Sequence, residues 1–273
     1  GDDGILVIVN DATRPTPTSK LLEILTRRCS LDRFTFLIAT GSHKASDDAE
    51  LEWIFGPLMS KIPRDKIICH DAKDSSQLAD FGKTERGNPL QFNKLVKEFG
   101  KILVVTTVEP HYFAGFTGGR KSLLPGVAGY ETITANHKLA LEPEAATLKL
   151  KGNPVHDEMD DCLEKFEDKQ IFTIQAVLNR NRNLYSVSAG DIRLAFKDAV
   201  ARATEVFCVK IQERTDIVVT VAPYPMDIDL YQSQKALENA KTAVKQNGII
   251  ILVSSCRKGI GPETFYQLMS SCD

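Results

Sequence analysis

Short apolar runs alternate along the chain with segments in which apolar residues recur at helical spacing. Because the runs are continuous rather than interrupted by polar residues, they predict strands covered on both faces, as in a parallel sheet flanked by helices. The expected strands are 5–9, 34–40, 66–69, 101–108, 171–177 and 184–188, and the expected helices are 19–28, 46–55, 154–166 and 191–206.

This alternation places the chain in the α/β class, with a Rossmann-like, mostly parallel sheet flanked by helices. We expect one α/β domain in residues 1–208, which would carry catalysis and cofactor binding, and the start of a second, smaller one in residues 209–273. Because the chain ends within FYQLMSSCD, a helix-like segment, this second domain is expected to be truncated. Its expected elements are strand 216–222, helix 233–246 ending at Asn247-Gly248, and strand 249–255.

The composition narrows the range of partners. Of 273 residues, 42% are hydrophobic and 26% charged, with a net charge of −2. We therefore expect neither nucleic acid nor an anionic membrane as a partner. No apolar run is long enough to span a bilayer and no signal peptide is visible, so we expect a cytoplasmic protein. The irregularly spaced cysteines are expected to be unpaired thiols: Cys29, Cys69, Cys162, Cys208, Cys256 and Cys272.

Polar residues suited to chemistry directly follow three of the expected strands. Asp11 and Arg14 follow the first strand, His43 the second, and Glu109 and His111 the strand 101–108. In an open parallel sheet, loops after the strand ends gather along one edge, where such folds place ligand sites. We therefore expect Arg14, His43 and His111 to converge.

Each of these residues has a structural and a functional interpretation. A loop histidine is commonly only a hydrogen-bonded structural residue, yet His43 and His111 are also suited to proton transfer at neutral pH. Arg14 either secures its proline-rich loop or provides a fork for a substrate carboxylate. Asp11 is either an Asx-turn residue or part of the site.

The segment EPHYFAGFTGGRKSLLPG gives the strongest local signal. Thr117, Gly118 and Gly119 precede Lys121 in a flexible loop that can present backbone N–H groups to an anion. An ATP-binding P-loop is not expected, because Arg120 replaces a required glycine and the LLPG sequence breaks the helix that should follow. A phosphate-bearing cofactor stays open, with Lys121 as a phosphate contact or a nucleophile.

Further candidates lie downstream. His137, in TITANHKLAL, is either a surface histidine or a metal ligand, since imidazole binds nickel, copper and zinc. Tyr231, Gln232 and Lys235 lie at neighbouring positions of one helical face in the second unit. They are either a solvated first turn or a lining for a small hydroxylated anion.

Taken together, these motifs resemble the nickel-pincer lactate racemase family. The resemblance rests on DATRPTPT, GSH, EPHYFAGFTGGRKSLLPG, the later Asn-His pair and YQSQK. It implies an isomerase that racemises or epimerises lactate or a related 2-hydroxyacid by reversible hydride transfer through a 2-ketoacid. The implied cofactor is nickel held by pyridinium-3-thioamide-5-thiocarboxylic acid mononucleotide, covalently attached at Lys121, with cofactor-synthesis proteins needed for loading.

The resemblance also implies individual roles. His43 and His111 would be the paired acid/base residues, because the hydroxyls of two enantiomers point to opposite sides. His137 would be the fourth nickel ligand, and Arg14 would hold the carboxylate with support from Asp11. The remaining substrate contacts would be Tyr231, Gln232 and Lys235.

Two functions of other classes stay open on the residues alone. One is a non-catalytic binding or cofactor-handling protein of the same fold, which a substitution at Lys121, His43 or His111 would have favoured. The other is a zinc hydrolase with His43, His111 and His137 as ligands. The HxH or HExxH spacing that would support it is absent.

Overall fold

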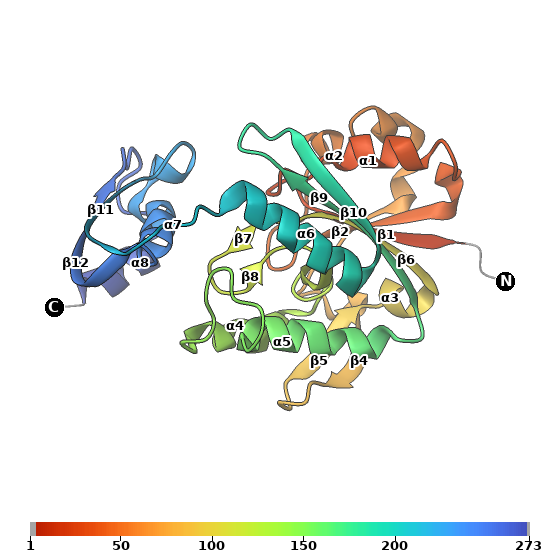
Figure 1. Ribbon diagram of the computed structural model, residues 1–273. Coiled ribbons are helices and arrows are strands. Elements are labelled where there is room, and N and C mark those ends of the chain that lie inside the picture. Colours follow the sequence, from red (N-terminus) through yellow and green to blue (C-terminus); the bar gives the residue numbers. More distant parts are fainter. Residues whose placement is uncertain (1–3, 272–273) are drawn as a thin grey trace. The chain divides into compact units, whose positions relative to one another are not determined.

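The computed structural model describes residues 4–271. The chain divides into two compact units, Gly1–Cys208 and Val209–Asp273. The first is built on a six-stranded sheet of order β10-β9-β6-β1-β2-β3 (Figure 1). All neighbouring strands are parallel except β10, which runs antiparallel to β9, so the predicted α/β class is confirmed. The strands are β1 (Ile5–Asn10), β2 (Phe34–Ala39), β3 (Ile67–Cys69), β6 (Lys101–Thr107), β9 (Gln170–Leu178) and β10 (Leu184–Asp191).

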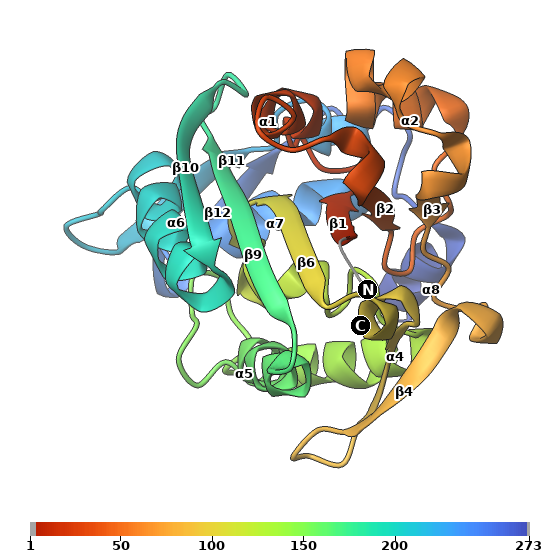
Figure 2. The same ribbon diagram turned by 90° about the vertical axis from the view of Figure 1, so that its right-hand side faces the viewer.

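Both faces of the central strands are buried, as their continuous apolar runs predict. Helices α1 and α2 cover one face of the sheet, and α4 and α5 cover the other (Figure 2). In β1, Val7 and Val9 belong to the cluster on the α1–α2 side, whereas Leu6 and Ile8 belong to the cluster on the opposite side. Burying each of these side chains stabilises the fold by about 1.5–3 kcal/mol. The helices are α1 (Thr18–Leu25), α2 (Asp48–Phe55), α3 (Leu95–Glu98), α4 (Tyr130–Lys138), α5 (Pro154–Asp161) and α6 (Ile192–Phe207).

Side-chain caps fix where several helices begin. Asp47 accepts from the N–H of Glu50 at 2.9 Å, and the Glu50 carboxylate accepts from the N–H of Asp47, which completes a capping box for α2. Asn153 caps α5 and Asp191 caps α6, and the side chain of each accepts hydrogen bonds from two backbone N–H groups of its helix. These caps hold the helices on the two faces of the sheet.

The order of the strands creates a switch point. From β1 the chain proceeds outward to β2 and β3, then returns through β4 (Leu78–Lys83) and β5 (Pro89–Asn93) to pair β6 with the other side of β1. The loops after β1 and β6 therefore diverge, and such a point at the carboxyl ends of the strands is where open α/β sheets bind ligands. The hairpin of β4 and β5 was not predicted.

The second unit pairs β11 (Thr215–Val221) with β12 (Val244–Val253) in parallel and contains α7 (Leu230–Ala240) and α8 (Glu263–Ser270). The prediction that a helix ends at Asn247-Gly248 is wrong, because both residues lie within β12. Asn247 has φ of 63°, and a Cβ at Gly248 would lie 2.6 Å from Val244 Cγ2. The pair thus forms an irregularity in the strand, where glycine permits a close approach.

Two further findings concern the described part of the chain. Its cysteines are unpaired, but Cys162 is buried whereas Cys69, Cys208 and Cys256 are only partly so. Cys272 lies outside the described residues. None of the helices in residues 4–271 has the length and apolar character needed to cross a membrane.

Candidate active site

Asp11 and His43 form a hydrogen-bonded pair between the loops after β1 and β2. Asp11 is 5% exposed. Its Oδ2 lies 2.7 Å from His43 Nδ1, and its Oδ1 accepts from the Thr13 hydroxyl at 2.6 Å. Asp11 thus shapes its own turn and also holds the histidine. The hydrogen bond to Asp11 raises the pKa of His43, against the opposing effect of partial burial.

Arg14 and Glu109 form an ion pair across the switch point. Arg14 Nη1 lies 3.4 Å from Glu109 Oε1, although the residues are 95 positions apart. The backbone of Glu109 is fixed by Thr117, whose hydroxyl accepts from the Glu109 N–H at 2.9 Å and whose N–H donates to the Glu109 carbonyl at 2.8 Å. Sequence reasoning gave Glu109 no role, although its position after β6, beside a basic loop, was a usable signal.

His111 lies on a short hairpin of β7 (Pro110–His111) and β8 (Gly115–Phe116). Its Nδ1 accepts from the Ala114 N–H at 3.3 Å, and its ring packs edge-on against Phe113 with centroids 4.5 Å apart. Burial, followed by the charges of Lys121 and Arg14, holds the pKa of His111 far below its usual value. His111 is therefore neutral at physiological pH, whereas His43 is favoured in its charged form.

Arg120 fills the inside of the loop that carries His111. It is 1% exposed and donates to the carbonyls of Ala114 at 3.0 Å, Phe116 at 3.3 Å and Gly118 at 3.4 Å. Its guanidinium also lies over the Phe196 ring of α6, 4.2 Å from the centroid. Burial lowers the pKa of Arg120 to about 9, so it keeps its charge at neutral pH. This anchor was not predicted.

Lys121 follows this anchor in a 3-10 turn, Gly119–Ser122. Burial, then the charges of Arg120 and Arg14, lowers its pKa well below the usual value for a lysine, which favours the neutral, nucleophilic amine. Its Nζ lies 5.6 Å from the centre of the Phe113 ring. No α-helix begins directly after the loop, in agreement with the exclusion of an ATP-binding P-loop.

Gly118, which precedes this turn, and Gly119, its first residue, have left-handed backbone, with φ of 88° and 51°. A Cβ at Gly118 would lie 2.4 Å from Val108 Cγ2. The N–H groups of Thr117 and Lys121 donate to carbonyls within the loop. The glycines thus allow the loop to lie directly against the end of β6.

His137 lies in the last turn of α4, with its ring 5.1 Å from that of Phe113. Its Nδ1 is buried and makes no hydrogen bond of normal geometry, although the backbone of Ile133, one turn earlier in α4, raises the pKa of the ring. Burial, then the charge of Lys121, lowers its pKa to about 4, so the imidazole is neutral. A buried nitrogen without a partner is costly unless a ligand or metal uses it.

The structure brings these groups together. The positive charge of Arg14 acts to lower the pKa values of His43, His111 and Lys121, which shows that the four side chains lie near one another. The ring of Phe113, which sequence reasoning did not single out, contacts His111, Lys121 and His137. Within residues 4–271, no three His, Cys, Asp or Glu side chains are grouped to hold a metal ion by themselves. The three-histidine zinc site considered from the sequence is therefore not formed.

The candidates of the second unit lie at the start of α7. Asp229 caps this helix by accepting from the Gln232 N–H at 2.7 Å, and Lys235 Nζ donates to Gln232 Oε1 at 2.8 Å. Tyr231 packs edge-on against Phe265, with centroids 5.2 Å apart. Gln232 and Lys235 thus share one face of the first turns.

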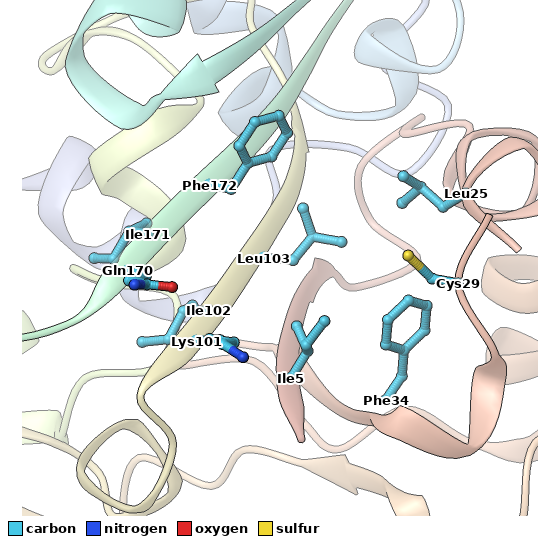
Figure 3. A pocket seen from close by; sticks show the side chains of 10 residues that line it. All are labelled: Ile5, Leu25, Cys29, Phe34, Lys101, Ile102, Leu103, Gln170, Ile171 and Phe172. Atoms are coloured by element: carbon cyan, nitrogen blue, oxygen red, sulfur yellow. The ribbon is translucent and has the colours of Figure 1, made fainter. Parts of the chain in front are cut away.

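An apolar cavity of about 400 Å³ lies elsewhere, at the amino-terminal ends of β1, β6 and β9 (Figure 3). Ile5, Leu103 and Phe172 contribute to its lining, and Lys101 and Gln170 are its polar members. Since the ionisable groups described above follow the carboxyl ends of the strands, this cavity is not the candidate active site.

An α/β unit with acid/base, cationic and nucleophilic groups at its switch point is an enzyme-like scaffold. Residues 1–148 match the family model described as lactate racemase N-terminal domain, and residues 210–273 match that of the lactate racemase C-terminal domain. The chain belongs to the lactate racemase family.

Curated relatives and solved structures agree with this assignment. A lactate racemase of Thermoanaerobacterium thermosaccharolyticum is 30% identical over 98% of this chain and 63% of its own length. A lactate racemase of Lactiplantibacillus plantarum is 33% identical over 100% of this chain and 65% of its own length. The lactate racemase apoprotein structure from T. thermosaccharolyticum superposes with a TM-score of 0.90 at 31% identity, covering 100% of this chain and 66% of that one. A Thermotoga maritima protein, at 22% identity and a TM-score of 0.66, shares the fold. This chain thus spans about two thirds of the length of its relatives.

Proposed function

We propose that this protein contributes the catalytic body of a racemase or epimerase for lactate or a close 2-hydroxyacid relative. The reaction would proceed by reversible hydride transfer through a 2-ketoacid. The observation that carries the proposal is the unequal pair of histidines at the switch point: His43 is hydrogen-bonded to a carboxylate, whereas the ring of His111 packs against Phe113. Family membership supports the same conclusion.

The charge states of the site suit this reaction. Arg14 keeps guanidinium N–H groups beyond the one directed at Glu109, and these would hold the substrate carboxylate. Neutral His111 would accept the hydroxyl proton of one enantiomer. His43, whose Nδ1 is bound to Asp11, would exchange a proton at Nε2 with the hydroxyl of the other enantiomer. Two acid/base residues are required because the two hydroxyls point to opposite sides of the substrate.

The residues present also fit a nickel-bearing nucleotide. His137 offers a neutral imidazole with an unpartnered buried nitrogen. Lys121 offers a neutral amine for the covalent link, on the loop formed by Thr117, Gly118 and Gly119. When bound, the nickel-pincer group would supply the hydride acceptor. We propose that the other metal donors belong to the nucleotide, and that cofactor-synthesis proteins load it.

The candidate residues of the second unit are proposed as substrate contacts. We propose that Tyr231, Gln232 and Lys235 contact the substrate from the domain that begins near Val209, while residues 1–208 carry the catalytic and cofactor groups. The pairing of Lys235 with Gln232 gives this helix face both a cation and an amide, which suit a small hydroxylated anion.

The test is the intact mass of the full-length protein produced with nickel and the cofactor-synthesis enzymes. We expect an adduct with bound nickel in the wild type and its loss in Lys121→Ala. Lys138→Ala, an exposed lysine of α4, is the matched control and should keep the adduct. Racemisation of single lactate enantiomers would then be measured. An unmodified mass in folded wild-type protein would rule out the proposed function.

A further inference from the structure

Two carboxylates lie at the switch point in different surroundings. Asp11 is buried, and both of its carboxylate oxygens have a hydrogen-bond partner: Oδ2 lies 2.7 Å from His43 Nδ1, and Oδ1 accepts from the Thr13 hydroxyl at 2.6 Å. The Glu109 side chain is 32% exposed, and its contact is the ion pair with Arg14 at 3.4 Å. This distance is long for a charge-assisted hydrogen bond, so the negative charge of Glu109 is only partly compensated.

We propose that Glu109 is a specificity-determining residue that makes the site favour monocarboxylic over dicarboxylic 2-hydroxyacids. The inference rests on the proposed function, because it takes Arg14 as the residue that holds the substrate carboxylate. A carboxylate bound to Arg14 lies close to Glu109. A second carboxylate on the same substrate adds another repulsive interaction with Glu109, and a partly buried site screens this repulsion less than open solvent does.

The cations of the first unit do not offset this repulsion. Arg120 is enclosed by the carbonyls of its own loop at 3.0–3.4 Å. Lys121 is the proposed attachment point of the cofactor, and His43 is hydrogen-bonded to the carboxylate of Asp11. Of the cations compared here, Arg14 is the one placed to receive a substrate anion, and Glu109 already shares it.

The position of Glu109 is independent of Arg14. Its N–H and its carbonyl are both bonded to Thr117, and the preceding residues belong to β6. The backbone from which the Glu109 side chain extends therefore keeps its place when Arg14 adjusts on binding. Because these backbone hydrogen bonds do not involve the carboxylate, replacing the carboxylate with the isosteric amide removes its charge and leaves them in place.

The experiment compares wild-type and Glu109→Gln holoenzyme, both full length. The KM of lactate and the inhibition constant of malate, the dicarboxylic probe, are measured at low salt, with calorimetric binding of both acids to the cofactor-free protein in parallel. We expect the malate-to-lactate preference to rise about fivefold in Glu109→Gln. Glu109→Asp, which keeps the charge, should stay near wild type. Glu142→Gln removes a glutamate paired with Arg86 at the same 3.4 Å and should change nothing.

The outcomes are distinguishable. An unchanged preference in Glu109→Gln, with lactate still racemised, overturns this inference and leaves the proposed function standing. Wild-type protein that is loaded with cofactor but binds neither acid overturns both. If Glu109→Gln is unfolded by circular dichroism, Glu109→Ala removes the same charge and must shift the preference in the same direction.

Discussion

His43 Nδ1 lies 2.7 Å from Asp11 Oδ2, which joins the loop after β2 to the loop after β1. The bond leaves Nε2 as the ring nitrogen available to a substrate. It also makes the two candidate acid/base histidines unequal, because the His111 ring is hydrogen-bonded to the Ala114 N–H instead of a carboxylate, and this partly buried ring packs against Phe113. The unequal pair has consequences for both stability and catalysis.

The first prediction concerns stability. The folded pKa of His43 is raised above its usual 6.5. A group with a raised folded pKa stabilises the protein fully below its unfolded pKa and loses that effect as pH rises through the folded pKa. Asp11→Asn should therefore lower the free energy of unfolding more at pH 5.5 than at pH 8.5. The difference between the two losses should be less than about 1 kcal/mol, because His43 is half exposed to solvent. Urea unfolding at the two pH values measures this, and an equal loss at both would contradict it.

The second prediction concerns the two histidines in catalysis. His43→Gln and His111→Gln should each reduce racemisation by about 100-fold or more, since a positioned acid/base contributes that much. Each variant keeps one histidine, so each should still form stoichiometric 2-ketoacid from one enantiomer, and the favoured enantiomer should differ between them. Single-turnover assays with pure D- and L-lactate test this. The same enantiomer reacting in both variants would exclude opposite-face roles.

Much of the site could be read from the sequence because strand ends carry topological information. Once β1, β2 and β6 are recognised as parallel strands, Arg14, His43 and His111 are placed on one edge of the sheet. The pairing of Arg14 with Glu109 could not be read in this way. The Arg14–Glu109 pair forms only because β6 lies beside β1 in the sheet. The two strands are not consecutive in the sequence, and the chain joins them by a crossover that includes the β4–β5 hairpin.

Other features depend on tertiary packing that periodicity does not report. An arginine in a glycine-rich loop is expected at the surface. The Arg120 guanidinium instead donates to three carbonyls of its own loop and lies over the Phe196 ring of α6. The β4–β5 hairpin was missed because few of its side chains are buried, which leaves a weak apolar pattern. Asn247-Gly248 has the sequence of a helix end, but the packing of Gly248 against Val244 places the pair inside a strand.

The third prediction tests the Arg120 anchor. Arg120→Met should lower the free energy of unfolding by about 3 kcal/mol, because it leaves buried carbonyls without donors and removes the stacking on Phe196. Arg86→Met, which breaks an exposed pair with Glu142, should cost less than about 0.5 kcal/mol. Chemical denaturation with circular dichroism measures both. Equal losses in the two variants would show that Arg120 is not an anchor.

The last prediction separates backbone strain from steric conflict in the cofactor loop. Gly118 and Gly87 have nearly equal φ values of 88° and 83°, but a Cβ at Gly118 would lie 2.4 Å from Val108 Cγ2 and one at Gly87 would meet nothing within 4 Å. Gly87→Ala should therefore cost only the strain of left-handed backbone, about 1 kcal/mol. Gly118→Ala should cost about 3 kcal/mol, because strain and overpacking add. It should also reduce adduct formation at Lys121, since the loop can no longer lie against β6. Unfolding curves and intact masses of both variants decide this, and similar unfolding losses with full adduct in both would contradict the close approach at Gly118.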